Sequence, residues 1–178
     1  EPENIIAEAK KLISSGTKEI CLLGQNVNSY FANNVNFVEL LKNLDKLEGL
    51  ERLRFISPHP KDFQKDLANA FVDLKSLCEH MHLPLQSGSN RILNKMRRFY
   101  TIETFLEKVN LLRKRLPRAT ISTDLIVGFP GETEEEFQMT MEAVNKIRFD
   151  SIYSFKYSPR PGTPAAKYAE QIPENVRS

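Results

Sequence analysis

The sequence has no tryptophan, only two cysteines, and no apolar run near the roughly 20 residues that span a membrane. Cys21 and Cys78 lie too far apart for zinc-site spacing and are too few for a disulfide scaffold, and they indicate a reducing, cytoplasmic setting. The N-terminus lacks the basic and apolar succession of a signal peptide. Neither a phosphate-binding glycine loop nor a serine-hydrolase elbow is present.

What remains is an ordinary globular composition. Hydrophobic residues make up 40% of the 178 residues and charged residues 27%, enough for one domain with a sizeable core. The net charge of +2 neither requires nor excludes a nucleic-acid partner. Because the first methionine is Met81 and the chain opens at Glu1-Pro2, we expect a piece of a longer protein.

Apolar periodicity predicts five helices that alternate with five strands. The helical stripes fall within residues 5–13, 37–47, 63–74, 102–112 and 137–147, and a capping box at Thr133 opens the last. Short β-rich runs at 19–24, 52–57, 80–86, 120–128 and 151–157 lie between them. Such alternation predicts an α/β fold with parallel strands, and it is compatible with either a barrel or an open sheet.

Two of the predicted strands carry polar residues on one face. In the run 80–86 the odd positions are apolar, whereas the even positions are His80, His82, Pro84 and Gln86. Parallel strands are normally buried on both faces. A lumen that holds a polar ligand explains the pattern, and a solvated edge strand is the alternative.

The loops that end the predicted strands are where an α/β protein keeps its chemistry. They read Gly24 to Tyr30, Ser57 to Pro60, Gln86 to Asn90 and Gly128 to Thr133. Each also has a purely structural interpretation: an Asn-rich turn, a bystander histidine, a capped helix start and a βα turn with Phe129 in the core.

Charge is uneven along the chain. Residues 91–118 contain nine Lys or Arg and two Glu, which suits either a polyanion contact or a solvated helix face. His80 and His82 share a strand face, but no third ligand follows at a suitable spacing, so no metal site is predicted.

Taken in order, the loops resemble the radical SAM methylthiotransferases. The resemblance covers nearly the whole chain and rests on these strings: LGQNVNSY at 23–30, RFISPHP at 54–60, HLPLQSGS at 82–89, MRR at 96–98, TDLIVGFPGET at 123–133 and YSPRPGT at 157–163. The string at 24–30 is most similar to the branch that adds a methylthio group to N6-isopentenyladenosine beside the tRNA anticodon.

The resemblance implies a partial TIM-type (βα)6 barrel that lacks its first strand, with residues 1–178 forming a fragment of the radical SAM core domain. It implies S-adenosylmethionine (SAM) and two [4Fe–4S] clusters as cofactors of the full-length enzyme. The cluster ligands, the N-terminal cluster domain and the C-terminal TRAM domain are then absent from this chain, which we expect to be inactive alone, with no catalytic or metal-binding residue. The implied cofactor-binding residues are Gly24, Gln25, Asn26, His82, Gln86, Ser87, Asp124, Ile126, Gly128 and Phe129.

The implied partner is tRNA, and no membrane contact is expected. Basic residues proposed to contact tRNA are Arg97, Arg98, Arg113, Lys114, Arg115 and Arg160. Because a missing first strand exposes a sheet edge, self-association is also expected. The alternatives are a branch of the same family that modifies a ribosomal protein, and a non-catalytic RNA-binding scaffold.

Overall fold

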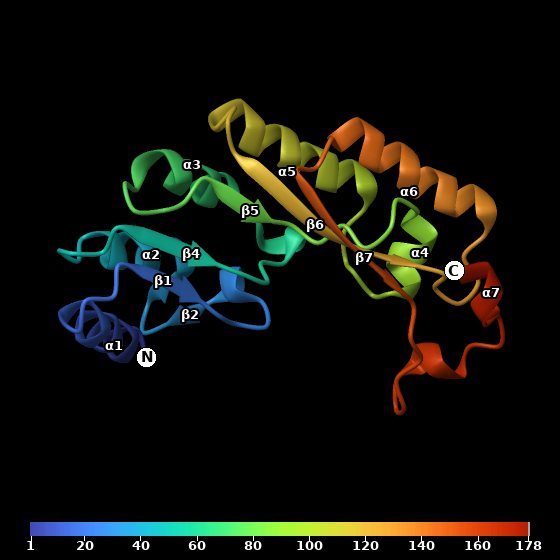
Figure 1. Ribbon diagram of the computed structural model, residues 1–178, viewed down its shortest axis with the longest axis horizontal. Helices are drawn as coiled ribbons and strands as arrows, with labels where there is room; N and C mark the ends of the chain where they lie inside the picture. The colour runs from blue at the N-terminus through green and yellow to red at the C-terminus, as the bar shows by residue number, and fades with distance from the viewer. Residues whose placement is uncertain (178) are drawn as a thin grey trace. The chain divides into compact units, whose positions relative to one another are not determined.

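The computed structural model describes residues 1–177, which form two compact units (Figure 1). The first unit comprises Glu1–Leu83 and Asn110–Thr120, and the second comprises Pro84–Val109 and Ile121–Ser178. Helix α5 (Ile102–Arg115) contributes residues to both units.

The first unit is an α/β layer around a parallel strand pair. Strand β1 (Glu19–Leu22) pairs with β4 (Arg52–Phe55), Ile20 lying opposite Leu53. Its remaining elements are α1 (Pro2–Ser14), η1 (Val27–Ser29), β2 (Phe31–Ala32), β3 (Val35–Asn36), α2 (Phe37–Asp45), η2 (Pro60–Asp62), α3 (Lys65–Asp73) and β5 (His80–His82). Among residues 1–177, β1 has β4 as its only named partner strand, and self-association through its other edge stays a prediction.

The core of this unit is aromatic at its centre. The Phe55 ring of β4 meets Phe37 of α2 edge-on, with ring centroids 5.1 Å apart, and lies 5.8 Å from the ring of Phe71 of α3. Helix α2 starts where the sequence favours it, because Asn36 and Glu39 form a capping box. Leu41 and Leu44 of the same helix are fully buried.

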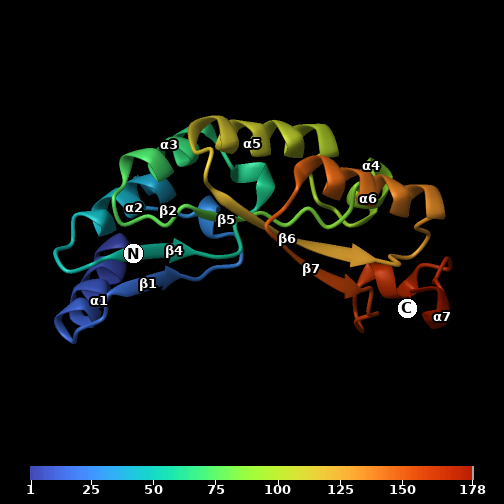
Figure 2. The same cartoon turned by 45° about the horizontal axis from the view of Figure 1, so that its top comes forward.

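The second unit places its helices against one face of another parallel pair. Strand β6 (Thr120–Val127) pairs with β7 (Ser151–Lys156). Helix α6 (Glu134–Ile147) lies along one face of this pair (Figure 2). The other elements are α4 (Asn90–Lys95), η3 (Pro164–Lys167) and α7 (Glu174–Arg177). The register puts Asp124 opposite Tyr153 and Ile126 opposite Phe155, so these four side chains share a face of the sheet.

An ion pair between Arg91 and the buried Glu136 links three segments of the second unit. Glu136, near the start of α6, accepts hydrogen bonds from the Ser89 hydroxyl (2.7 Å) and from Arg91 Nε (2.8 Å). Its other oxygen accepts from Arg91 Nη2 and from the Thr133 amide. Arg91 also donates to the Gly131 carbonyl, so one guanidinium joins α4, α6 and the turn after β6.

The α/β prediction is confirmed, and all five predicted helices are present. The Thr133 capping box is also confirmed. The strand predicted at 80–86 ends at His82. The capped helix start considered at Gln86 to Asn90 is confirmed, because Ser89 caps α4. The β2–β3 hairpin was not predicted. The hairpin turns at Asn33 and Asn34, both at positive φ, a conformation that asparagine tolerates better than most residues.

The predicted apolar face of α6 is only partly its buried face. Phe137, Met141, Val144 and Ile147 were expected to pack inward, and Ile147 is buried, whereas Met141 is 40% exposed. The other buried residues of the helix are Glu136, Thr140 and Ala143. The physical reason is the Arg91 ion pair, which satisfies Glu136 so that a polar edge of the helix can turn inward.

The ion pair predicts a specific loss of stability in acid. Paired chiefly with Arg91, Glu136 has its pKa lowered to about 2, below its unfolded value of 4.5. Its stabilisation is therefore complete above about pH 5 and disappears as the pH falls toward 2. Because Arg91 is half exposed, we expect Glu136→Gln to lower the free energy of unfolding by about 1–3 kcal/mol at pH 7.

Urea denaturation between pH 2 and 7 measures this effect. The Glu136→Gln variant should show a weaker pH dependence than the wild type between pH 5 and 2, whereas Glu142→Gln on the same helix should match the wild type. Equal pH dependence in all three proteins would contradict the assignment.

Candidate functional site

A cavity of about 510 Å³ lies in the second unit, on the face of β6 and β7 that carries Asp124, Ile126 and Phe155. Both strands and the loops that follow contribute to it. Its lining residues are Gln86, Arg98, Asp124, Ile126, Phe155, Lys156, Tyr157, Ser158, Arg160, Thr163 and Ala165. The predicted cofactor residues Gln86, Asp124 and Ile126 thus share one cavity with the predicted tRNA residues Arg98 and Arg160.

Gln86 is the most unusual residue of this cavity. Its backbone has φ +69°, a left-handed conformation that costs a side-chain-bearing residue about 1–3 kcal/mol. The backbone is held there because the Gln86 amide donates to the Asp124 carbonyl (2.8 Å) and its carbonyl accepts from the Ile126 amide (2.9 Å). These two backbone hydrogen bonds hold residue 86 beside β6.

The Gln86 side chain is buried without being satisfied. Only 5% of the residue is exposed, and its Oε1 has no hydrogen-bond partner among residues 1–177. Tyr157, which also lines the cavity, has a buried hydroxyl in the same condition. Since a buried polar atom normally finds a partner, both atoms indicate a polar ligand.

The turn after β6 is held by its own carboxylate. Gly128, at φ +71°, donates its amide hydrogen to Glu132 Oε2 (2.6 Å), and the Glu132 amide donates to the Phe129 carbonyl (2.9 Å). Burial raises the pKa of Glu132 above its ordinary value. The Arg177 side chain lies where a β-carbon on residue 128 would stand, so this position needs glycine for space as well as for backbone conformation.

Two predicted ligand residues of the second unit are used for packing. The Phe129 ring is 95% buried between Tyr157, at 5.2 Å, and Tyr168, at 6.3 Å, which favours the core interpretation over stacking on a base. Ser87 is fully buried, and its hydroxyl accepts from the Ser89 amide and lies 3.4 Å from the Thr140 hydroxyl. Neither residue lines the cavity.

Gly24, Gln25 and Asn26 lie in the first unit, in the exposed turn after β1. The loop that continues this turn is tied to the loop after β4, because Asn28 Nδ2 donates to the His59 carbonyl (3.0 Å) and the His59 amide donates to Asn28 Oδ1 (2.7 Å). His59 Nδ1 in turn accepts from the Lys61 amide. The bystander interpretation of His59 is therefore favoured, with the added role of joining two strand-end loops.

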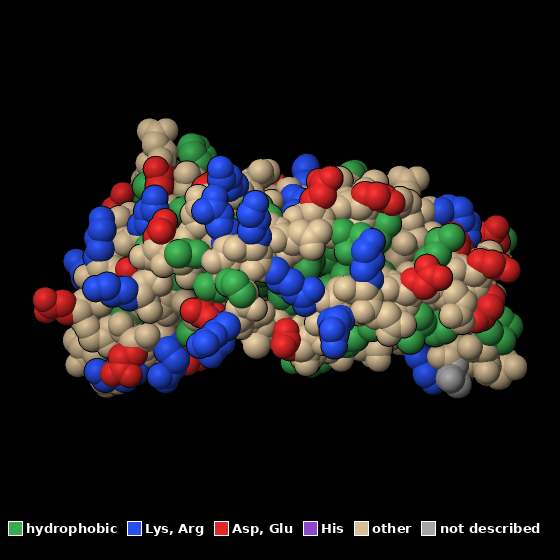
Figure 3. All heavy atoms as spheres, turned by 90° about the horizontal axis from the view of Figure 1, so that it is seen from above, with side chains coloured by type: hydrophobic (Ala, Val, Ile, Leu, Met, Phe, Trp, Pro, Cys, Tyr) green, Lys and Arg blue, Asp and Glu red, His purple; other side chains and the backbone are tan. Residues whose placement is uncertain are grey.

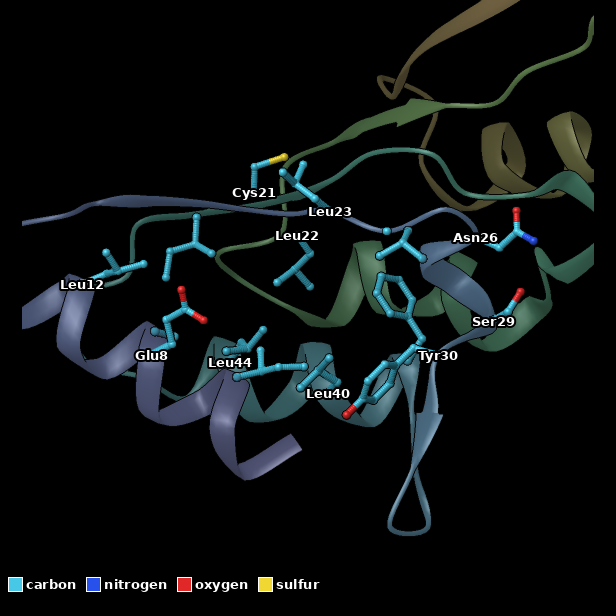
Figure 4. A pocket seen from close by; sticks show the side chains of 16 residues that line it. Glu8, Leu12, Cys21, Leu22, Leu23, Asn26, Ser29, Tyr30, Leu40 and Leu44 are labelled. Carbon is cyan, nitrogen blue, oxygen red and sulfur yellow. The ribbon is translucent and has the colours of Figure 1, made fainter. Parts of the chain in front are cut away.

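A second cavity, of about 500 Å³, lies between β1 and helices α1 and α2 (Figure 4). Leu22, Leu40 and Leu44 point into it, and Glu8 places a carboxylate at its α1 wall. Gly24 and Asn26 reach only one end of this largely apolar space.

His82, another predicted cofactor residue, lies at the end of β5 and is half buried.

The basic residues predicted to contact tRNA fall into two groups. Arg98 and Arg160 line the cavity of the second unit, and Arg97 is exposed beside Arg98. Arg113, Lys114 and Arg115 form the last turn of α5, in the first unit. Lys and Arg side chains gather over that unit, at the left of Figure 3, with carboxylates among them.

Phe155, Lys156 and Tyr157 were missed from the sequence although they line the cavity. The signal was available in the strand parity of 151–157, which puts Tyr153, Phe155 and Tyr157 on one face. Among residues 1–177, no group of three or more His, Cys, Asp or Glu is arranged to hold a metal ion. No helix in this range is long and apolar enough to cross a membrane.

Comparison with known proteins decides the family. The model of the radical SAM superfamily matches residues 1–144. The chain belongs to the radical SAM superfamily.

Its fold is also that of solved radical SAM enzymes. Coproporphyrinogen III oxidase from Escherichia coli superposes with a TM-score of 0.70 at 16% identity, covering 99% of this chain and 43% of that one. A radical S-adenosylmethionine methyltransferase from Kitasatospora setae gives 0.74 at 19% identity, over 93% and 30%.

Relatives within the superfamily are much more similar in sequence. A tRNA-2-methylthio-N(6)-dimethylallyladenosine synthase of Clostridium botulinum is 54% identical over 99% of this chain. The enzyme of the same name from Natranaerobius thermophilus is 52% identical, also over 99%. The chain spans 40% of the length of each of these relatives.

The Asn28–His59 pair predicts a graded loss of stability. Asn28→Ala removes both hydrogen bonds and should lower the free energy of unfolding by about 1–3 kcal/mol. Asn28→Asp keeps the acceptor for the His59 amide and should fall between alanine and the wild type. Urea denaturation at pH 7 measures the stability of the three proteins. Hydrogen exchange at the His59 amide should become faster from the wild type to Asn28→Asp and again to Asn28→Ala. An alanine variant as stable as the wild type would show that the two loops do not depend on this pair.

Proposed function

We propose that this chain is the SAM-binding part of a tRNA methylthiotransferase, which adds a methylthio group to N6-isopentenyladenosine beside the anticodon. The observation that carries the proposal is the buried Gln86 amide oxygen without a partner, in a cavity shared with Asp124 and Ile126, in a radical SAM chain. The 54% identity to proteins named for this reaction supports the choice of substrate. The relatives described above are named for this tRNA reaction, which favours it over a ribosomal-protein substrate or a non-catalytic scaffold.

The residues of the cavity suit SAM. Gln86 Oε1 accepts a hydrogen bond from an N–H or O–H group of the ligand, and Asp124 faces the same space with a carboxylate that complements a cation. Ile126 supplies apolar contact from the same strand. Gly128 lies outside the lining of this cavity, and the space beside it is filled by the Arg177 side chain. When bound, SAM supplies both the 5′-deoxyadenosyl radical and the transferred methyl group, and the chain's own residues bind, orient and shield it.

The rest of the proposal extends beyond this cavity. Gly24, Gln25, Asn26 and His82 complete the SAM site within a partial (βα)6 barrel that lacks its first strand, and residues 1–178 belong to that core domain. Residues 1–177 hold no set of ligands that fits an iron–sulfur cluster, so the two [4Fe–4S] clusters belong to other parts of the whole protein, as does the TRAM domain. The whole enzyme works in the cytoplasm, and this part alone is inactive.

Gln86 and Ser87 give a direct test of the SAM site because we propose opposite roles for these neighbours, ligand binding for Gln86 and packing for Ser87. In the whole protein, Gln86→Leu should lower SAM affinity at least 10-fold and leave stability unchanged or about 1 kcal/mol higher, since it removes an unpaired buried group. Ser87→Ala should lower stability by about 1 kcal/mol and leave SAM affinity unchanged. Equilibrium dialysis with labelled SAM and urea denaturation provide the two readouts. Loss of SAM affinity only in the Ser87 variant would refute the assignment.

The reaction itself is tested in the whole protein, reconstituted anaerobically with iron and sulfide. With SAM, a reductant and isopentenylated tRNA, nucleoside digestion and mass spectrometry should show a methylthio group on the target adenosine. Formation of 5′-deoxyadenosine without a modified nucleoside would reject the substrate. If neither product forms although the clusters are loaded, the enzyme proposal itself is wrong.

A further inference from the structure

The cavity of the second unit carries more positive charge than SAM requires. Its lining includes Arg98, Lys156 and Arg160 against the single carboxylate of Asp124. Lys156 pairs with Glu174 at 3.6 Å, which leaves the two arginines as the larger excess. SAM itself carries a sulfonium and an ammonium group against one carboxylate, so two further cations suit a second, anionic ligand.

The backbone has a defined conformation at both arginines. Arg98 lies between Arg97 at φ +57° and Phe99 at φ +56°, and two left-handed residues around one position fix the course of the chain there. Arg160 begins a tight turn in which the Thr163 amide and hydroxyl both donate to the Arg160 carbonyl, at 3.2 and 2.8 Å. Both cations therefore come from shaped loops at the cavity.

The same cavity contains an unusual apolar surface. Phe155 lies opposite Ile126 in the β6–β7 register and lines the cavity, yet it remains 55% exposed. A half-exposed phenylalanine between cations has the composition of a nucleotide site, where a base stacks on the ring and the neighbouring arginines contact phosphates.

We propose that Phe155 stacks on the target base of the RNA substrate, and that Arg98 and Arg160 contact the phosphates on either side of it. This inference rests on the proposed function and adds the residues that recognise the substrate. An adenine ring is present in SAM as well as in the RNA. The phosphate-binding arginines favour the RNA, because SAM has no phosphate.

The test uses the whole protein and an anticodon stem-loop RNA that carries either adenosine or an abasic nucleotide at the target position. Phe155→Leu keeps an apolar side chain without the aromatic face, and Phe155→Tyr restores the ring. Phe31→Leu is the matched control, because Phe31 is 68% exposed but does not line the cavity. Fluorescence anisotropy gives RNA affinity, equilibrium dialysis gives SAM affinity, and circular dichroism checks folding.

Phe155→Leu should weaken binding of the adenosine stem-loop about 10-fold, with binding of the abasic RNA and of SAM changed less than about 2-fold. Phe155→Tyr and Phe31→Leu should bind like the wild type. Arg98→Ala and Arg160→Ala should weaken both RNAs equally and each lower the slope of log affinity against log salt by about one.

Two results would overturn the inference. If Phe155→Leu weakens SAM and spares the adenosine RNA, the ring belongs to the cofactor's adenine. If neither ligand is affected, Phe155 has no binding role. Failure of the proposed function is recognised separately, because the wild-type protein would then not distinguish the anticodon stem-loop from an unrelated hairpin, or would not bind SAM.

Discussion

The ion pair between Arg91 and Glu136 joins three separate segments of the second unit. Through it, the start of α6, the start of α4 and the Gly131 carbonyl are bound to one guanidinium. The turn that carries Gly128 and the loop that carries Gln86 both run directly into these anchored segments. The positions of the candidate ligand groups therefore follow from a charged interaction at the opposite side of the sheet from the cavity.

The two ligands proposed for this cavity suit different residues of its lining. Gln86 and Asp124 offer uncharged and negative oxygen atoms, which suit the cationic and hydrogen-bond-donating groups of SAM. Arg98 and Arg160 offer positive charge beside an exposed aromatic ring, which suits a nucleotide. Under the proposed function such a cofactor and such a substrate must come together, and one cavity lined by both sets of residues meets that need.

The helices and their capping residues could be predicted from the sequence, because helix periodicity and capping signals are local. The polar face of the run 80–86 included Gln86, which lines the cavity although the strand itself ends at His82. The orientation of α6 could not be predicted, because burial of Glu136 depends on Arg91, 45 positions earlier in the chain. For the same reason the sequence could not decide whether Phe129 is a core residue or a ligand contact, because its partners Tyr157 and Tyr168 come from later segments. Phe155 was missed because an apolar residue in a strand normally signals core.

Gln86 has an evolutionary consequence. A left-handed backbone and a buried unpaired oxygen both burden the ligand-free protein, so selection for folding alone would replace this glutamine, with glycine as the least strained choice. Under the proposed function, ligand binding offsets this cost and keeps the residue. In a descendant that kept the fold without binding the cofactor, position 86 should then be among the first to change, well before the buried Leu83 and Leu85 that precede it.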